Sequence, residues 1–93
     1  MDYINIHYKW LYRLTNNGFG FSYESSDRSE ERARIGAKIR HFRESKGMEA
    51  KQLAMLTNID AANLSRIEQG KYSVGFDILT KIASALGVKV DLV

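Results

Sequence analysis

The strongest constraint on the fold is a series of short amphipathic segments between residues 30 and 87, each followed by glycine or asparagine. Apolar side chains recur there every three or four positions, which is the period of an α-helix that buries one face. Glycine and asparagine tolerate the left-handed conformation that commonly ends a helix. The sequence therefore predicts helices over residues 30–46, 50–57, 61–69 and 75 or 76–86, closed by Gly47, Asn58, Gly70 and Gly87.

The same period identifies one apolar face on each predicted helix. Asp60 precedes the third helix, where its carboxylate would accept hydrogen bonds from the first-turn N–H groups. We expect the core to contain Ile35, Ile39, Phe42, Leu53, Ala54, Leu56, Leu64, Ile67, Phe76, Leu79, Ile82, Ala83 and Leu86.

Residues 4–14 follow a different pattern, with apolar side chains at every even position. A period of two, together with many aromatic and β-branched residues, is typical of a β-strand. Asn17-Gly18 separates this run from a second alternating run over residues 19–23. Asn-Gly at such a place favours a β-hairpin with a type I′ turn. Residues 88–93 also alternate and predict a further strand.

The polar residues 25–29 predict a linker, with Asp27 or Ser29 as the cap of a helix that starts near Glu30. We therefore divide the chain into a hairpin with its linker, residues 1–28, and a helical domain with a strand, residues 29–93. The first part holds three basic and three acidic residues, so the net charge of +3 falls entirely in the second part. An anionic partner is expected to bind there.

Composition excludes several functional classes. The 93 residues include no cysteine and two histidines, so disulfides and thiolate metal sites are excluded and no cofactor is expected. No Ser-His-Asp, P-loop or paired-carboxylate constellation is recognisable, so no enzymatic activity is expected. No apolar run approaches the roughly 20 residues of a membrane span, and no signal peptide is recognisable. We expect a cytoplasmic protein.

Residues 53–67 have the spacing of a helix-turn-helix unit, in which two short helices cross at a steep angle. The small side chain of Ala54 fits where the two backbones approach each other. Asn58 accepts the left-handed conformation that the tight turn needs. Apolar side chains at positions 53, 59, 64 and 67 would then anchor the unit on the first helix. The outer face of the second helix is left with short side chains and Arg66.

Residues 32–87, which are 56 of the 93 residues, resemble the Cro/CI-type (Xre-family) helix-turn-helix domain of phage repressors and bacterial regulators. The resemblance implies a mostly α fold, a lambda repressor-like bundle of four to five helices, to which the N-terminal hairpin and C-terminal strand are added. It also implies double-stranded DNA as the partner and no cofactor. The matching stretches are Ile35–Arg40, Arg43–Met48, Gln52–Ala54, Leu64–Lys71 and Leu79–Val88.

The resemblance further implies roles for individual positions. Arg66 can donate two hydrogen bonds to guanine O6 and N7, and alanines can contact thymine methyl groups. Arg43 and Glu68 match a structural ion pair between the first helix and the recognition helix. The base-reading positions are Ala61, Ala62, Asn63, Ser65 and Arg66, and the backbone-contacting positions are Gln69 and Lys71. Lys51 carries a charge that can also hold a phosphate. Tyr72 could contact a phosphate or only cover the loop between the third and fourth helices.

The chain departs from the family pattern in two places. Glu49 and Ala50 stand where the family usually has a Ser or Thr cap followed by Gln, so one expected phosphate contact is missing. Glu49 would also repel DNA if it lies close to it. Ala61 and Ala62 are short where longer polar residues are common, which favours shape readout or the summed contacts of a dimer.

The strand candidates predict self-association, because an isolated hairpin is marginally stable in water. We expect residues 4–14 and 88–93 to form one antiparallel sheet that a second chain continues or covers. A homodimer would present two recognition helices about 34 Å apart to a pseudo-palindromic operator. The expected interface consists of Tyr8, Trp10, Tyr12, Val88, Val90 and Leu92.

Alternatives stay open at this stage. The domain could be the antitoxin subunit of a toxin–antitoxin pair, which binds a toxin protein and autoregulates its operon, or an assembly module without a DNA role. The aromatic stripe at positions 8, 10 and 12 could stack on nucleic-acid bases. Arg66 could be a solvated surface residue. The operator sequence and the choice between repression and activation are left open.

Overall fold

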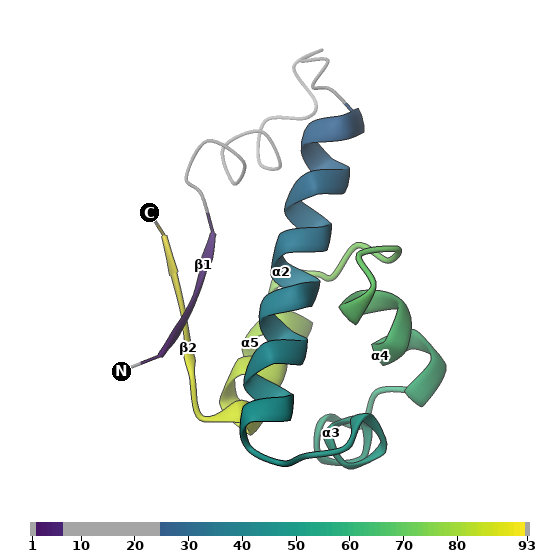
Figure 1. The fold of residues 1–93 in the computed structure, drawn as a ribbon, viewed down its shortest axis with the longest axis vertical. Helices are drawn as coiled ribbons and strands as arrows, with labels where there is room; N and C mark the ends of the chain where they lie inside the picture. The colour runs from purple at the N-terminus through teal and green to yellow at the C-terminus, as the bar shows by residue number, and fades with distance from the viewer. Residues whose placement is uncertain (1, 7–24, 93) are drawn as a thin grey trace.

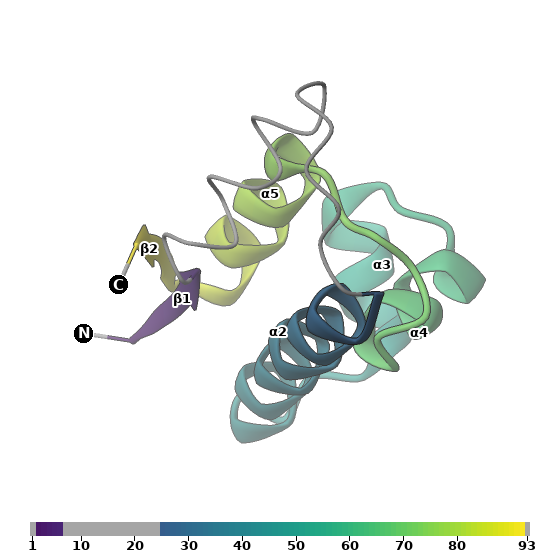
Figure 2. The same ribbon diagram turned by 90° about the horizontal axis from the view of Figure 1, so that it is seen from above.

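Four helices and two strands make up residues 2–6 and 25–92, which are the residues described by the computed structural model (Figure 1). Seen from above, the two strands lie on one side of the molecule, the α3–α4 pair lies on the other, and α2 and α5 lie between them (Figure 2). The elements in chain order are β1 (Tyr3–Ile6), α2 (Ser25–Ser45), α3 (Ala50–Thr57), α4 (Ala61–Glu68), α5 (Phe76–Leu86) and β2 (Lys89–Leu92).

The predicted helix ends are largely confirmed. Asn58 ends α3 in the left-handed conformation with φ 56°, and Gly87 ends α5 with φ 72°. Asp60 begins α4, where its carboxylate accepts hydrogen bonds from the N–H groups of Ala62 and Asn63 at 3.0 and 3.2 Å. These caps satisfy backbone groups that a short helix leaves without a partner.

The core lies where the four helices and the two strands meet. The buried side chains include most of those predicted from the helical period, and β1 adds Ile4 and Ile6, which are 0% and 4% exposed. Leu56 and Phe76 are exceptions, with exposures of 63% and 58%. Each lies in a terminal turn of its helix. The remaining buried apolar residues are Ile35, Ile39, Phe42, Leu53, Ala54, Leu64, Ile67, Leu79, Ile82, Ala83, Leu86 and Val88.

The two strands pair in parallel, so the predicted antiparallel sheet is wrong for the residues described. Tyr3 lies opposite Lys89 and Ile6 lies opposite Leu92. An antiparallel pair can be closed by a tight turn, whereas parallel strands need a long crossover connection. Here the whole helical domain is that connection. Arg34 ties α2 to the sheet, because its Nη2 donates to the carbonyl oxygen of Asn5 in β1. Its Nε donates to Glu31 on the same helix.

The linker predicted at residues 25–29 is also wrong, since these residues form the first turns of α2. Asp27 and Ser29 lie inside the helix, so neither is its N-cap. No glycine or proline interrupts residues 25–29, so the helix that packs on the core from Ile35 onward can continue outward through them. The division drawn between residues 28 and 29 falls within this helix.

Several other predictions concern residues outside those described. Of the predicted strand over residues 4–14, the structure describes residues 4–6. The predicted hairpin turn and the residues Tyr8, Trp10 and Tyr12 lie outside the described residues. Within residues 2–6 and 25–92, no helix is long and apolar enough to cross a bilayer. The same part of the chain has no group of three or more His, Cys, Asp or Glu side chains that could hold a metal ion.

Candidate nucleic-acid interface

The turn between α3 and α4 sets the crossing of the two helices. Asn58 donates its backbone N–H to the carbonyl of Met55 at 3.3 Å, and Ile59 donates to the carbonyl of Ala54 at 3.0 Å. Ala54 is 5% exposed, as expected for the small residue at a close helix crossing. The turn spans residues 58–60, and α4 starts immediately after it. The side chains on the outer face of α4 are exposed.

A close backbone approach between α2 and α4 holds α4 in place. A Cβ atom added at Gly36 would lie 2.6 Å from the Glu68 carbonyl oxygen and would also collide with the Ile67 carbonyl oxygen. Real Cβ contacts are essentially never shorter than 3.0 Å, so this position needs glycine. Gly70, with φ +76°, similarly lies against the Ala33 backbone, where an added Cβ would be 2.7 Å from the Ala33 Cα. The close approach of α2 to the end of α4 therefore depends on the absence of a side chain at Gly36 and at Gly70.

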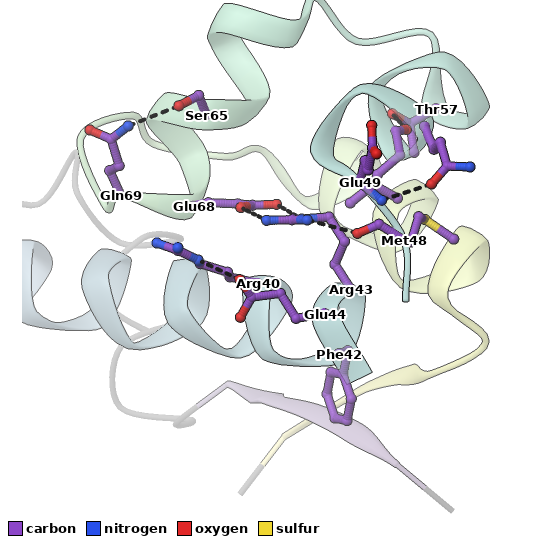
Figure 3. A network of polar contacts seen from close by, with 12 residues as sticks. Arg40, Phe42, Arg43, Glu44, Met48, Glu49, Thr57, Ser65, Glu68 and Gln69 are labelled. Carbon is purple, nitrogen blue, oxygen red and sulfur yellow. Dashed lines mark hydrogen bonds and ion pairs between the residues drawn. The ribbon is translucent and has the colours of Figure 1, made fainter. Parts of the chain in front are cut away.

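A buried ion pair joins the same two helices (Figure 3). Arg43 on α2 donates from Nε to Glu68 Oε2 at 2.8 Å and from Nη2 to Glu68 Oε1 at 3.0 Å. Its Nη1 donates to the Met48 carbonyl at 2.8 Å, so all three nitrogens of the guanidinium are used within the protein. The hydrogen bonds to Glu68 raise the pKa of Arg43, so the ion pair stabilises the charged form that an arginine already has at physiological pH. This geometry is that of a structural ion pair, which holds α4 against α2.

The outer face of α4 consists of small side chains and one arginine. Ala61, Ala62 and Arg66 are exposed, while Asn63 and Ser65 are half-buried. Leu64 and Ile67 point inward and are 0% and 3% exposed. The structure thus brings the five predicted base-reading residues together on one short helix.

Arg66 is held along the helix by a neighbour. Its Nη1 donates to Asn63 Oδ1 at 2.8 Å, one turn earlier. This bond uses one of the five guanidinium donors and leaves the others for a further partner. Asn63 therefore acts as a positioning residue for Arg66, a role that the sequence analysis did not assign.

The predicted backbone-contacting residues lie on and around α4. Lys51, Lys71 and Tyr72 are exposed, and Tyr72 is 48% exposed. Gln69 caps the end of α4, and its Nε2 donates to Ser65 Oγ at 2.8 Å (Figure 3). That bond leaves the second amide hydrogen of Gln69 available to a phosphate.

The N-terminus of α3 is closed by a negative residue. Glu49 is its N-cap, and the Glu49 N–H donates to Gln52 Oε1 at 2.8 Å (Figure 3). This bond uses the amide oxygen of Gln52 and leaves its Nε2 hydrogens free, whereas Glu49 has no donor to offer a phosphate. Glu49 is exposed, and its carboxylate opposes the attraction of the helix N-terminus for an anion.

Comparison with known families decides what kind of domain this is. A family model described as a helix-turn-helix domain matches residues 34–93, which are 60 of the 93 residues. The chain belongs to this helix-turn-helix family. The match confirms the predicted Cro/CI-type (Xre) DNA-binding domain, and the mostly helical fold agrees with it. A search of curated proteins gives no match.

Three solved structures resemble the helix-turn-helix domain, each with a TM-score of 0.62. The clp gene regulator ClgR from Corynebacterium glutamicum is 33% identical, over 62% of this chain and 74% of that one. The restriction-modification controller protein C.AhdI from Aeromonas hydrophila is 27% identical, over 63% of this chain and 89% of that one. An HTH_3 family transcriptional regulator from Vibrio cholerae is 31% identical, over 66% of this chain and 34% of that one.

Proposed function

We propose that this helix-turn-helix protein is a sequence-specific transcriptional regulator that inserts α4 into the DNA major groove. The observation that carries the proposal is the exposed face of α4, where two alanines and Arg66 stand clear of the core. Such a face lets the helix approach the base edges closely, because no long side chain separates it from the groove floor. The similar solved structures are themselves regulators or controllers, which supports the same class.

Within this proposal, the residues divide by the part of DNA that they touch. Arg66, oriented by Asn63, donates to guanine O6 and N7, and Ala61 and Ala62 contact thymine methyl groups. Ser65 lies beside this surface. Lys51, Gln69, Lys71 and Tyr72 contact phosphates and fix the register of α4 along the groove. Because direct base contacts are few, sequence-dependent DNA shape contributes part of the specificity.

We further propose that the protein binds a pseudo-palindromic operator as a homodimer. A single α4 of eight residues reads a short half-site, and a second copy doubles the contacts. The antitoxin alternative stays a prediction, which a search for a toxin gene beside this one would test.

Selection of bound sequences from a random DNA pool tests the proposed function. The wild-type protein is expected to enrich one motif with two-fold symmetry. The Arg66→Ala variant is expected to enrich a motif that has lost its preference at one position of each half-site. An unenriched pool, with binding that depends on salt concentration alone, would show that the protein is not sequence-specific.

A further inference from the structure

The edge of β2 that faces away from β1 has no role in the proposed DNA interface. The sheet in this part of the chain has two strands, so β2 has one edge on which no described strand lies. Lys89 donates its N–H to the Asp2 carbonyl at 3.2 Å, so its backbone groups face β1. The backbone N–H and C=O groups of successive residues point to opposite edges of a strand. The N–H and C=O of Val90 therefore face the outer edge, where they can bond a further strand.

We propose that this edge pairs with β2 of a second copy, antiparallel, about a two-fold axis that passes through Val90. The proposal deepens the homodimer of the proposed function and rests on it. A two-fold interface must be complementary to itself. The sequence of β2, Lys89-Val90-Asp91-Leu92, meets that condition, because opposite charges flank its central valine.

The two charges favour the register centred on Val90 over the two neighbouring registers. In an antiparallel pair related by a two-fold axis, the residue on the axis lies opposite itself. An axis at Lys89 would oppose two lysines, and an axis at Asp91 would oppose two aspartates, both of which are destabilising. An axis at Val90 instead places Lys89 of each copy opposite Asp91 of the other, so both charge pairs attract.

Backbone geometry agrees with the register that the charges select. The outward-facing groups of Val90 allow the two Val90 residues to exchange both of their hydrogen bonds. Lys89 and Asp91 then form the non-hydrogen-bonded pairs, which are the closer type, with Cα atoms about 4.5 Å apart. Both charged side chains are exposed, while Val90 is half-buried and packs against the core.

The pairing would also relieve a weakness of the sheet. Two strands alone are marginal, and parallel sheets are ordinarily covered. Joining the two sheets gives four strands in the order β1-β2-β2-β1. The strands lie on the opposite side of the domain from the α3–α4 pair, so this interface leaves α4 uncovered (Figures 1 and 2).

Charge reversal on the full-length protein tests the pairing. Lys89→Glu places a second carboxylate opposite Asp91, and Asp91→Lys places a second ammonium group opposite Lys89, so each variant alone repels itself. Sedimentation equilibrium is expected to show a dissociation constant at least about tenfold higher for each variant than for the wild type. An equimolar mixture of the two variants restores both opposite-charge pairs and is expected to regain the wild-type dimer. Lys81→Glu, the same change at an exposed site on α5, is the matched control and is expected to leave the dimer intact.

The outcomes separate this proposal from the proposed function. A wild-type dimer that neither variant weakens, or a mixture that stays monomeric, overturns the β2 pairing and leaves the homodimer standing. A wild type that is monomeric at all concentrations overturns both the pairing and the homodimer. Neither result bears on base reading by α4, which the DNA selection tests separately.

Discussion

Glu68→Ala should destabilise the fold far more than the loss of a surface charge would. The carboxylate of Glu68 accepts two hydrogen bonds from Arg43, at 2.8 and 3.0 Å, and the two side chains are 7% and 11% exposed. The substitution removes both of these hydrogen bonds. Of its three hydrogen bonds, Arg43 then keeps the one to the uncharged Met48 carbonyl. A largely buried positive charge then loses its hydrogen-bonded carboxylate and keeps only the weaker attraction of Glu44.

The expected cost follows from this burial. Removing one partner of a buried pair costs about 3–5 kcal/mol, and we expect about 3 kcal/mol because the guanidinium keeps some contact with water. In a domain of this size, 1 kcal/mol corresponds to about 4–8 °C in Tm, so Tm should fall by about 12–24 °C. Thermal and urea unfolding followed by circular dichroism measure both quantities.

The chain offers a matched control on the same helix. Glu44 pairs with Arg40 at 3.2 Å, but the two side chains are 55% and 60% exposed (Figure 3). Glu44→Ala should therefore cost about 0.3–0.5 kcal/mol at most, as exposed pairs one turn apart do. If Glu68→Ala costs no more than Glu44→Ala, the reasoning from burial is refuted.

Three other variants test the interface and its support. Lys71→Ala should weaken binding to all DNA sequences alike and reduce the salt slope by about one unit, as measured by fluorescence anisotropy at several salt concentrations. Glu49→Gln should tighten DNA binding in the same assay, because it removes a repulsive charge at the N-terminus of α3; weaker or unchanged binding would place Glu49 away from the phosphates. Gly36→Ala should cost about 1–3 kcal/mol in urea unfolding, because the added Cβ meets the backbone of α4, whereas Gly75→Ala, with open space around it, should cost much less.

Local patterns predicted the helical part of the fold well. The stripe that begins at Ile35 and Ile39 indicated the buried face of α2, because helix period and burial are linked directly in an amphipathic helix. Asp60 and Asn58 indicated the bounds of the turn, because their side chain and backbone preferences act over two or three residues. The spacing of this unit predicted a helix-turn-helix, and the resemblance of residues 32–87 to the Cro/CI-type family added the family that the comparison then showed.

Features that depend on contacts distant in the sequence were missed. The direction of β1 relative to β2 cannot be read from alternation, because parallel and antiparallel strands alternate alike. Gly36 stood inside the recognised motif without an assigned reason, since its partner is the backbone of α4, at Ile67 and Glu68. The bond between Asn63 and Arg66 joins positions three apart on one helix, a spacing that does predict contact and could have been noted.

The parallel pairing of β1 with β2 also orders the events of folding. The helices from α2 to α5 are joined by short turns, so contacts among them can form as soon as each helix has been synthesised. Tyr3 pairs with Lys89, so the pairing of β1 with β2 cannot form until residue 89 has left the ribosome. Ile4 and Ile6, which the finished domain buries, therefore lack their strand partners Val90 and Leu92 for the whole of that interval.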